Sequence, residues 1–242
     1  MKNEHLVEVK SVWYAIPSAL PSAAAMECIQ EWMGMGYKVA VFRDKGTPPL
    51  PVDICMEGEY PGYASAVNAL VREILEREPE TEWIVTGGDD MVPDLDTPPD
   101  EIARQCSAHF GGTLGVMQPT GDTFGTDESG LCAAERVTIS PWMGREWCQR
   151  SYNGNGPLCE EYEHYFVDED LHDVASGLGL LRHRPDLTHF HRWWRRVGGD
   201  EPEHMDRHSY TDGRGIFMRR KKEGFPESGL KTEEREEFGS KR

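Results

Sequence analysis

The chain has 242 residues, of which 38% are hydrophobic, 10% aromatic and 29% charged, a composition typical of a soluble globular protein that buries a full core. No apolar run approaches the roughly 18–20 residues that cross a bilayer, and the N-terminus lacks a signal-peptide core. These features exclude a membrane span and predict a cytoplasmic protein. The net charge of −17 argues against non-specific nucleic-acid binding.

The charge is unevenly distributed along the chain. Residues 181–242 carry 15 Lys and Arg against 12 Asp and Glu, whereas residues 1–180 carry 11 against 31. The run RHRPDLTHFHRWWRR (182–196) could line a local basic cleft. The six cysteines are scattered without a CxxC pair, which disfavours a zinc module or a disulfide framework and predicts reduced thiols.

In the first half of the chain, short apolar runs alternate with segments of helical periodicity. We predict strands at residues 12–17, 38–42, 52–56 and 82–87. Apolar side chains at i, i+3, i+4 and i+7 predict helices around residues 25–33 and 67–75. Thr97 followed by Pro98 predicts the start of a further helix, with the threonine as its N-cap.

The second half is less regular. TLGVMQ (113–118) and RVTIS (136–140) are predicted as strands, SYNGNGPL (151–158) as a turn-rich loop, and residues 168–181 as a short helix. The tail from Lys221 is charged and poor in apolar residues, which is typical of partial disorder.

This alternation predicts an α/β fold in which helices flank a mostly parallel sheet. In such sheets, ligands bind outside the carboxyl ends of the strands. Asp44 and the pair Asp89 and Asp90, in the run WIVTGGDDMVPD, lie at two such ends. We therefore place the predicted ligand crevice there.

The order of these features resembles the glycosyltransferases of GT-A fold, close to family 2 and to small soluble members encoded by phages. The resemblance covers roughly residues 11–196, and it rests on YPGYASAVNAL, GGDDMVPD, FVDEDL and a later histidine-bearing strand. It implies a Rossmann-like domain over residues 1–197, with a nucleotide-binding half (1–96) and an acceptor half (97–197). Residues 198–242 would be a charged, partly disordered extension.

The resemblance implies a donor substrate and a metal ion. The donor would be a nucleotide diphosphate sugar, most readily a UDP-sugar, and Mn²⁺ or Mg²⁺ would neutralise its leaving diphosphate. Asp90 falls at the metal-ligand position of the family's acidic motif, and Asp89 at the middle position, where it could contact metal or donor. Gly88 stands where a third carboxylate is often found, so that contact with the ribose is in doubt.

Five further residues match donor-binding positions of the family. Gly62 and Asn68 match a Gly-x-x-x-x-x-Asn pattern, in which glycine admits the nucleotide and Asn68 ties the helix start to the donor loop. Asp44 matches an acidic residue that accepts a hydrogen bond from the base. Pro17 and Ser18, at the end of the first strand, would frame the same pocket.

A transfer that inverts the configuration of the sugar's anomeric carbon requires a base to deprotonate the acceptor hydroxyl. The register of the DEDL stretch makes Asp168 the candidate base and Asp170 the second choice; both could instead be helix-start residues. In THFHRWW, His191 is the first choice for a metal-side histidine and His189 the second. Trp142 and Trp147 lie where the family binds its acceptor.

The predicted function is thus transfer of a hexose or pentose to an acceptor hydroxyl, on modified phage DNA, on a protein or on a glycan. If phage-encoded, the enzyme would work in the host cytoplasm. Two alternatives remain open: a nucleotidyltransferase of related fold, and a non-catalytic nucleotide-sugar-binding protein.

Overall fold

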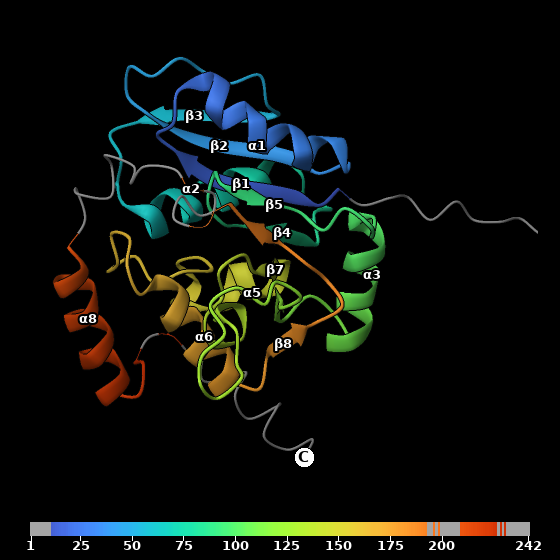
Figure 1. Cartoon of the computed structure of the whole chain (residues 1–242). Coiled ribbons are helices and arrows are strands. Elements are labelled where there is room, and N and C mark those ends of the chain that lie inside the picture. Colours follow the sequence, from blue (N-terminus) through green and yellow to red (C-terminus); the bar gives the residue numbers. More distant parts are fainter. Residues whose placement is uncertain are drawn as a thin grey trace, which may run out of the picture.

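The computed structural model describes residues 11–192, 196, 198, 209–226, 228 and 230 of the chain (Figure 1). Its strands, in chain order, are β1 (Trp13–Ser18), β2 (Lys38–Asp44), β3 (Ile54–Gly58), β4 (Trp83–Val85), β5 (Met91–Val92), β6 (Val116–Pro119), β7 (Trp142–Gly144), β8 (Leu181–Arg184) and β9 (Phe190–His191). Its helices are α1 (Ser22–Gly34), α2 (Tyr63–Arg77), α3 (Pro99–Phe110), α4 (Ala133–Arg136), α5 (Arg145–Arg150), the 3-10 helix η1 (Tyr152–Gly154), α6 (Val167–Gly177) and α8 (Tyr210–Lys222).

The central sheet has seven strands in the order β3-β2-β1-β4-β7-β6-β8. Neighbouring strands pair in parallel except at β7, which runs antiparallel to both β4 and β6. The predicted fold class, a mostly parallel α/β sheet with flanking helices, is therefore confirmed. The chain leaves β1 toward β2 on one side and later returns to β4 on the other, so the strand order reverses between β1 and β4. Ligands bind at such a reversal in open α/β sheets.

Side-chain alternation along β1 divides the core into two layers. Trp13 and Ala15 pack into the layer shared with α2 and α6, whereas Tyr14 and Ile16 pack into the layer shared with α1 and α3. A strand buried on both faces reads as a continuous apolar run, which is why WYAIP was recognisable in the sequence.

The helical stripes predicted in the first half are confirmed, with a shift at one start. α3 begins at Pro99 with Pro98 in the N-cap position, so Thr97 is not the cap. The Thr97 amide instead donates to Asp94 Oδ1 at 2.8 Å.

The strand predicted at residues 136–140 is wrong. Residues 133–136 form α4, and the antiparallel strand β7 begins only at Trp142, after Pro141. The side chains that gave the alternating pattern serve other contacts: Thr138 Oγ1 donates to Asp168 O at 2.9 Å, and Ser140 Oγ donates to Thr86 O at 3.0 Å.

Beyond residue 208 the structure contains a helix, α8, which lies beside α6 at the edge of the molecule (Figure 1). Within the described part of the chain, no helix is long and apolar enough to cross a membrane. All six cysteines are free thiols, and five of them are buried, as expected for core cysteines.

Candidate active site

The loop after β4 carries Gly87, Gly88, Asp89 and Asp90 to the carboxyl edge of the sheet, beside the end of β1. Two tyrosines, the buried Tyr14 and the partly buried Tyr63, hold its backbone. Tyr14 donates to Gly88 O at 2.5 Å, and Tyr63 donates to Gly87 O at 3.1 Å. The loop is therefore anchored to both the first strand and α2.

A side chain at position 88 would meet the carboxylate of Asp90. A Cβ atom placed on this residue would lie 2.4 Å from Asp90 Oδ1, well inside van der Waals contact. The Asp90 side chain folds back over the Gly88 backbone, so any side chain at position 88 would displace it.

The two neighbouring aspartates are directed to different partners. Ser18 Oγ, at the end of β1, donates to Asp89 Oδ2 at 2.6 Å. Asp90 Oδ2 lies 3.0 Å from His191 Nε2. The repulsion between adjacent carboxylates is thereby reduced, because each one has its own donor. The structure thus brings the predicted residues Ser18, Asp89, Asp90 and His191 together.

Arg43 is a charged residue of this region that the sequence reasoning did not single out. It is 1% exposed, and its NH1 donates to Ser18 O at 2.9 Å, to Leu20 O at 2.8 Å and to Ser18 Oγ at 3.3 Å. The guanidinium thus supports the serine that binds Asp89. The available signal was a basic residue directly after the apolar run VAVF, at the penultimate position of the strand KVAVFRD.

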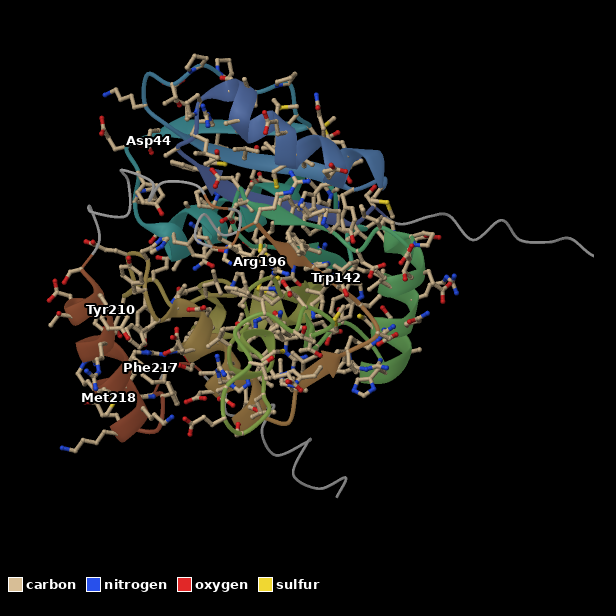
Figure 2. All side chains as sticks on the ribbon, in the orientation of Figure 1. Asp44, Trp142, Arg196, Tyr210, Phe217 and Met218 are labelled. Carbon is tan, nitrogen blue, oxygen red and sulfur yellow. The ribbon has the colours of Figure 1, made fainter. Side chains whose placement is uncertain are left out.

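His191 is delivered to Asp90 by a short strand from the far end of the chain. β9 pairs antiparallel with β5, and the Arg192 amide donates to Asp90 O at 2.8 Å. The His191 amide also lies 3.4 Å from Asp122 Oδ2, which accepts from Arg196 at 2.6 Å. Arg196 is labelled in Figure 2, and its guanidinium lies 3.9 Å from the centre of the Phe190 ring. Asp122 and Arg196 therefore brace the histidine strand.

His189 belongs to the core, not to the crevice. The single hydroxyl proton of Ser140 is donated to Thr86 O. In the 2.8 Å contact between Ser140 Oγ and His189 Nδ1, the histidine is therefore the donor. His189 Nε2 then accepts from Trp142 at 3.5 Å. Burial lowers the pKa of His189 to about 3, so the ring is neutral. Of the two predicted histidines, only His191 contacts the aspartate pair.

Asp168 stands at the start of α6, partly exposed, and its carbonyl is held by Thr138. Burial raises the pKa of the Tyr63 hydroxyl, and the charges of Asp168 and Asp90 raise it further. Both carboxylates therefore disfavour ionisation of this tyrosine.

The sequence did not single out Glu169, whose side chain interacts with that of Asp168. Its pKa is raised to about 9, first by burial and then by a hydrogen bond with the Asp168 side chain. Burial and the neighbouring Asp168 therefore both favour the protonated form of Glu169. A neutral carboxyl beside a carboxylate is the arrangement expected when two acids are too close for both to ionise.

Asp170, the second choice for the base, is a structural residue. Its side chain is fully buried and accepts hydrogen bonds from Tyr152 and Tyr162 at 2.9 Å each. Arg220 Nε adds an ion pair at 2.7 Å. An acceptor hydroxyl has no access to this carboxylate, so the base role predicted for Asp170 is corrected.

Asn68 is also a brace rather than a ligand contact. Its fully buried amide donates to Leu158 O at 2.9 Å and to Glu160 Oε1 at 3.0 Å, and it accepts from the Leu158 amide at 3.2 Å. All of its polar groups are thereby used, and they fix the 156–160 loop to α2. The predicted contact with the donor is corrected accordingly.

The remaining predicted donor residues are Gly62, Pro17 and Asp44. Gly62 has φ = 94°, and a Cβ atom there would lie 3.0 Å from Glu163 Cα. The glycine therefore allows the backbone at position 62 to pack closely against the backbone of Glu163. Pro17 and Asp44 lie near the ends of β1 and β2. Because β2 pairs in parallel with β1, with Arg43 opposite Ser18, Asp44 lies at the same edge of the sheet as Ser18.

Two other predictions about this region are corrected. Trp142 and Trp147 are fully buried, so neither offers a surface to an acceptor. In the described part of the 182–196 run, two arginines are neutralised by acidic partners: Arg184 pairs with Asp186, and Arg196 pairs with Asp122. Trp193, Trp194 and Arg195 lie outside the described residues.

The donor set of the crevice suits a divalent metal ion that is shared with a phosphate ligand. Among the described residues, no group of three or more His, Cys, Asp and Glu is placed to hold a metal. Asp90 and His191 offer two ligands, and an ion that also binds a diphosphate requires only one or two carboxylates from the protein. The residues present therefore fit a metal bound together with its substrate.

The fold and the crevice define an α/β protein with a carboxylate pair and a histidine at the point where its sheet reverses strand order. The sequence matches no protein-family model and no curated protein.

Two solved structures that resemble the chain are glycosyltransferases. One is involved in glycosylating the major capsid of PBCV-1 (10% identity, TM-score 0.30, 57% of this chain and 61% of that chain). The other is a mutant of Drosophila β-1,4-galactosyltransferase 7 in complex with manganese, UDP-Gal and xylobiose (12% identity, TM-score 0.42, 84% and 82%). TM-scores of 0.30 and 0.42 are too low for either likeness to bear on function.

Proposed function

We propose that this protein is a metal-dependent glycosyltransferase of GT-A type that moves a hexose or pentose from a nucleotide diphosphate sugar to an acceptor hydroxyl. The observation that carries the proposal is the contact of Asp90 with His191, 101 positions apart, where the sheet reverses strand order. A structural role alone does not require a carboxylate and an imidazole to meet at a partly exposed sheet edge.

In this proposal, Asp90 and His191 hold the metal. Of the two histidines that the sequence suggested, His191 is preferred because it contacts Asp90. The nitrogen ligand favours Mn²⁺ over Mg²⁺, because Mg²⁺ takes oxygen ligands. A divalent ion bound there would neutralise charge on the leaving diphosphate. Asp89, fixed by Ser18, faces the donor together with Asp44, and UDP-sugars are the first donors to test.

Asp168 is the proposed base. It accepts the proton of the acceptor hydroxyl as the oxygen bonds to the anomeric carbon and the bond to the diphosphate breaks, which inverts that carbon. Protonated Glu169 donates a hydrogen bond to Asp168 and cannot itself take the proton, so the two acids have separate roles.

The test is incubation with a panel of nucleotide sugars and Mn²⁺, with release of nucleoside diphosphate as the readout. Acceptors should include glucosylatable hydroxymethylated DNA, a glycan and a protein, since a phage-like enzyme would use one of these. We expect diphosphate release from wild type, and loss of at least about 100-fold for Asp90→Asn. Asp96→Asn, an exposed aspartate in the same segment, is the matched control and should keep wild-type turnover.

Three results would overturn the proposal. Release of pyrophosphate would indicate a nucleotidyltransferase. Metal-dependent binding of donors without turnover would indicate a non-catalytic binding protein. Equal rates for Asp90→Asn and Asp96→Asn would remove the metal assignment.

A further inference from the structure

The helix α8 lies beyond the predicted catalytic domain, yet it packs against the end of α6 that carries Asp168 (Figure 1). Most of its residues are exposed, with one charged exception. Arg220 is 2% exposed, whereas the neighbouring Arg219 side chain is 47% exposed. A buried arginine on an otherwise exposed helix requires a specific partner.

Its buried carboxylate partner is Asp170, two residues after the candidate base, and Arg220 also contacts Glu161 and Ser228. Arg220 contacts both carboxylate oxygens, through Nε at 2.7 Å and NH2 at 3.3 Å. Tyr152 and Tyr162 fill the remaining positions around the carboxylate. Removing one member of a buried pair leaves an uncompensated charge, so each member depends on the other.

A second contact holds the residue that precedes α6. Phe166 is its N-cap with φ = 72°, an unusual left-handed conformation for an aromatic residue. The Phe166 ring stacks on Phe217 of α8, with centroids 5.6 Å apart, and lies 4.9 Å from the ring of Tyr210 (both labelled in Figure 2). A strained backbone conformation of this kind persists only where packing around the residue holds it in place, here by the rings of α8.

The helix also approaches this turn closely. A Cβ atom on Gly213 would lie 2.7 Å from Tyr165 O, so only glycine fits there. Contacts from α8 therefore fix residues 165, 166 and 170, on both sides of Asp168. In contrast, the aspartate pair and His191 are held by β1, β5 and β9.

We infer that Arg220 is a positioning residue for glycosyl transfer, acting through Asp170 on the turn that carries Asp168. The inference rests on the proposed function, and it makes the C-terminal segment part of the catalytic apparatus. Misplacement of a reacting group by about 1 Å lowers rates roughly 100-fold. Loss of Arg220 should therefore lower kcat and leave donor binding unchanged.

The experiment compares Arg220→Met, Arg220→Lys and the matched control Arg219→Met in the full chain. For each variant, kcat and KM for the acceptor are measured, together with the Kd for nucleoside diphosphate and Mn²⁺. We expect Arg220→Met to lower kcat roughly 10- to 100-fold with the Kd unchanged, Arg220→Lys to recover part of the loss, and Arg219→Met to match wild type.

If Arg220→Met fails to fold, the double variant Asp170→Asn with Arg220→Met removes both buried charges and restores electroneutrality. It should bind nucleoside diphosphate normally and still transfer slowly. An active wild type whose folded Arg220 variants equal Arg219→Met would refute this inference alone. A wild type that turns over no donor would refute the proposed function as well.

Discussion

Acidification should destabilise this protein through His189, and the effect can be calculated from its surroundings. The ring is 3% exposed and hydrogen-bonded on both nitrogens, and its pKa is about 3 in the folded state. An unfolded histidine takes up a proton near pH 6.5. Between these two values the unfolded chain binds one more proton than the folded chain, so stability falls as the pH is lowered.

The size of the effect follows from proton linkage. The free energy of unfolding should fall by about 1.4 kcal/mol for each pH unit below about 6.5, to a total of roughly 5 kcal/mol. Other groups titrate in the same range, so wild type must be compared with His189→Gln. Because glutamine does not titrate, the substitution itself changes the free energy of unfolding by an amount that does not depend on pH.

The assay is urea unfolding followed by far-UV circular dichroism, from pH of about 7 to about 4.5. The stability advantage of wild type over His189→Gln should shrink by about 3 kcal/mol across this range. His172→Gln, on α6, controls for the loss of a histidine elsewhere in the protein. A wild-type advantage that stays constant with pH would refute the claim that His189 is buried as a neutral ring.

Three other substitutions test separate parts of the site. Gly88→Ala should weaken the Kd for nucleoside diphosphate and Mn²⁺ roughly tenfold, because the new Cβ displaces Asp90; calorimetry showing wild-type affinity would contradict this. Glu169 releases its proton only near pH 9 when folded but near pH 4.5 when unfolded, so its burial costs stability increasingly as pH rises. Glu169→Gln should therefore raise the Tm more at pH 8 than at pH 5, and an equal change at both would count against the shared proton. Asn68→Ala should destabilise the fold by about 3 kcal/mol in urea and leave the nucleotide Kd unchanged, and a weakened Kd would restore Asn68 to the donor pocket.

The sheet and its first helices were predictable because burial leaves a local pattern. The run at 12–17 is apolar on both faces, and α2 repeats its apolar residues at helical spacing. The segment 136–140 misled because Thr138 and Ser140 alternate with apolar residues while bonding to distant backbone. In this segment the polar side chains are the buried ones, whereas Val137 and Ile139 are only half-buried, so the alternation does not mark a strand with an apolar inner face.

For the site, carboxylates at strand ends were visible in the sequence, whereas their partners were not. Ser18 and His191 came from resemblance to a family. Arg43 and Asp122 were missed because their contacts cross 25 and 69 positions of the chain. Asp170 was misassigned because its burial depends on Arg220, 50 residues away, in a segment that looks polar.

The two-residue pairing of β5 with β9 determines when Asp90 and His191 can meet during folding. It joins Met91 to His191 and closes a loop of about one hundred residues, so the chain loses loop-closure entropy when this pairing forms. During synthesis, both aspartates leave the ribosome long before the histidine. A growing chain therefore cannot form the contact between Asp90 and His191 until β9 has been synthesised and has paired with β5.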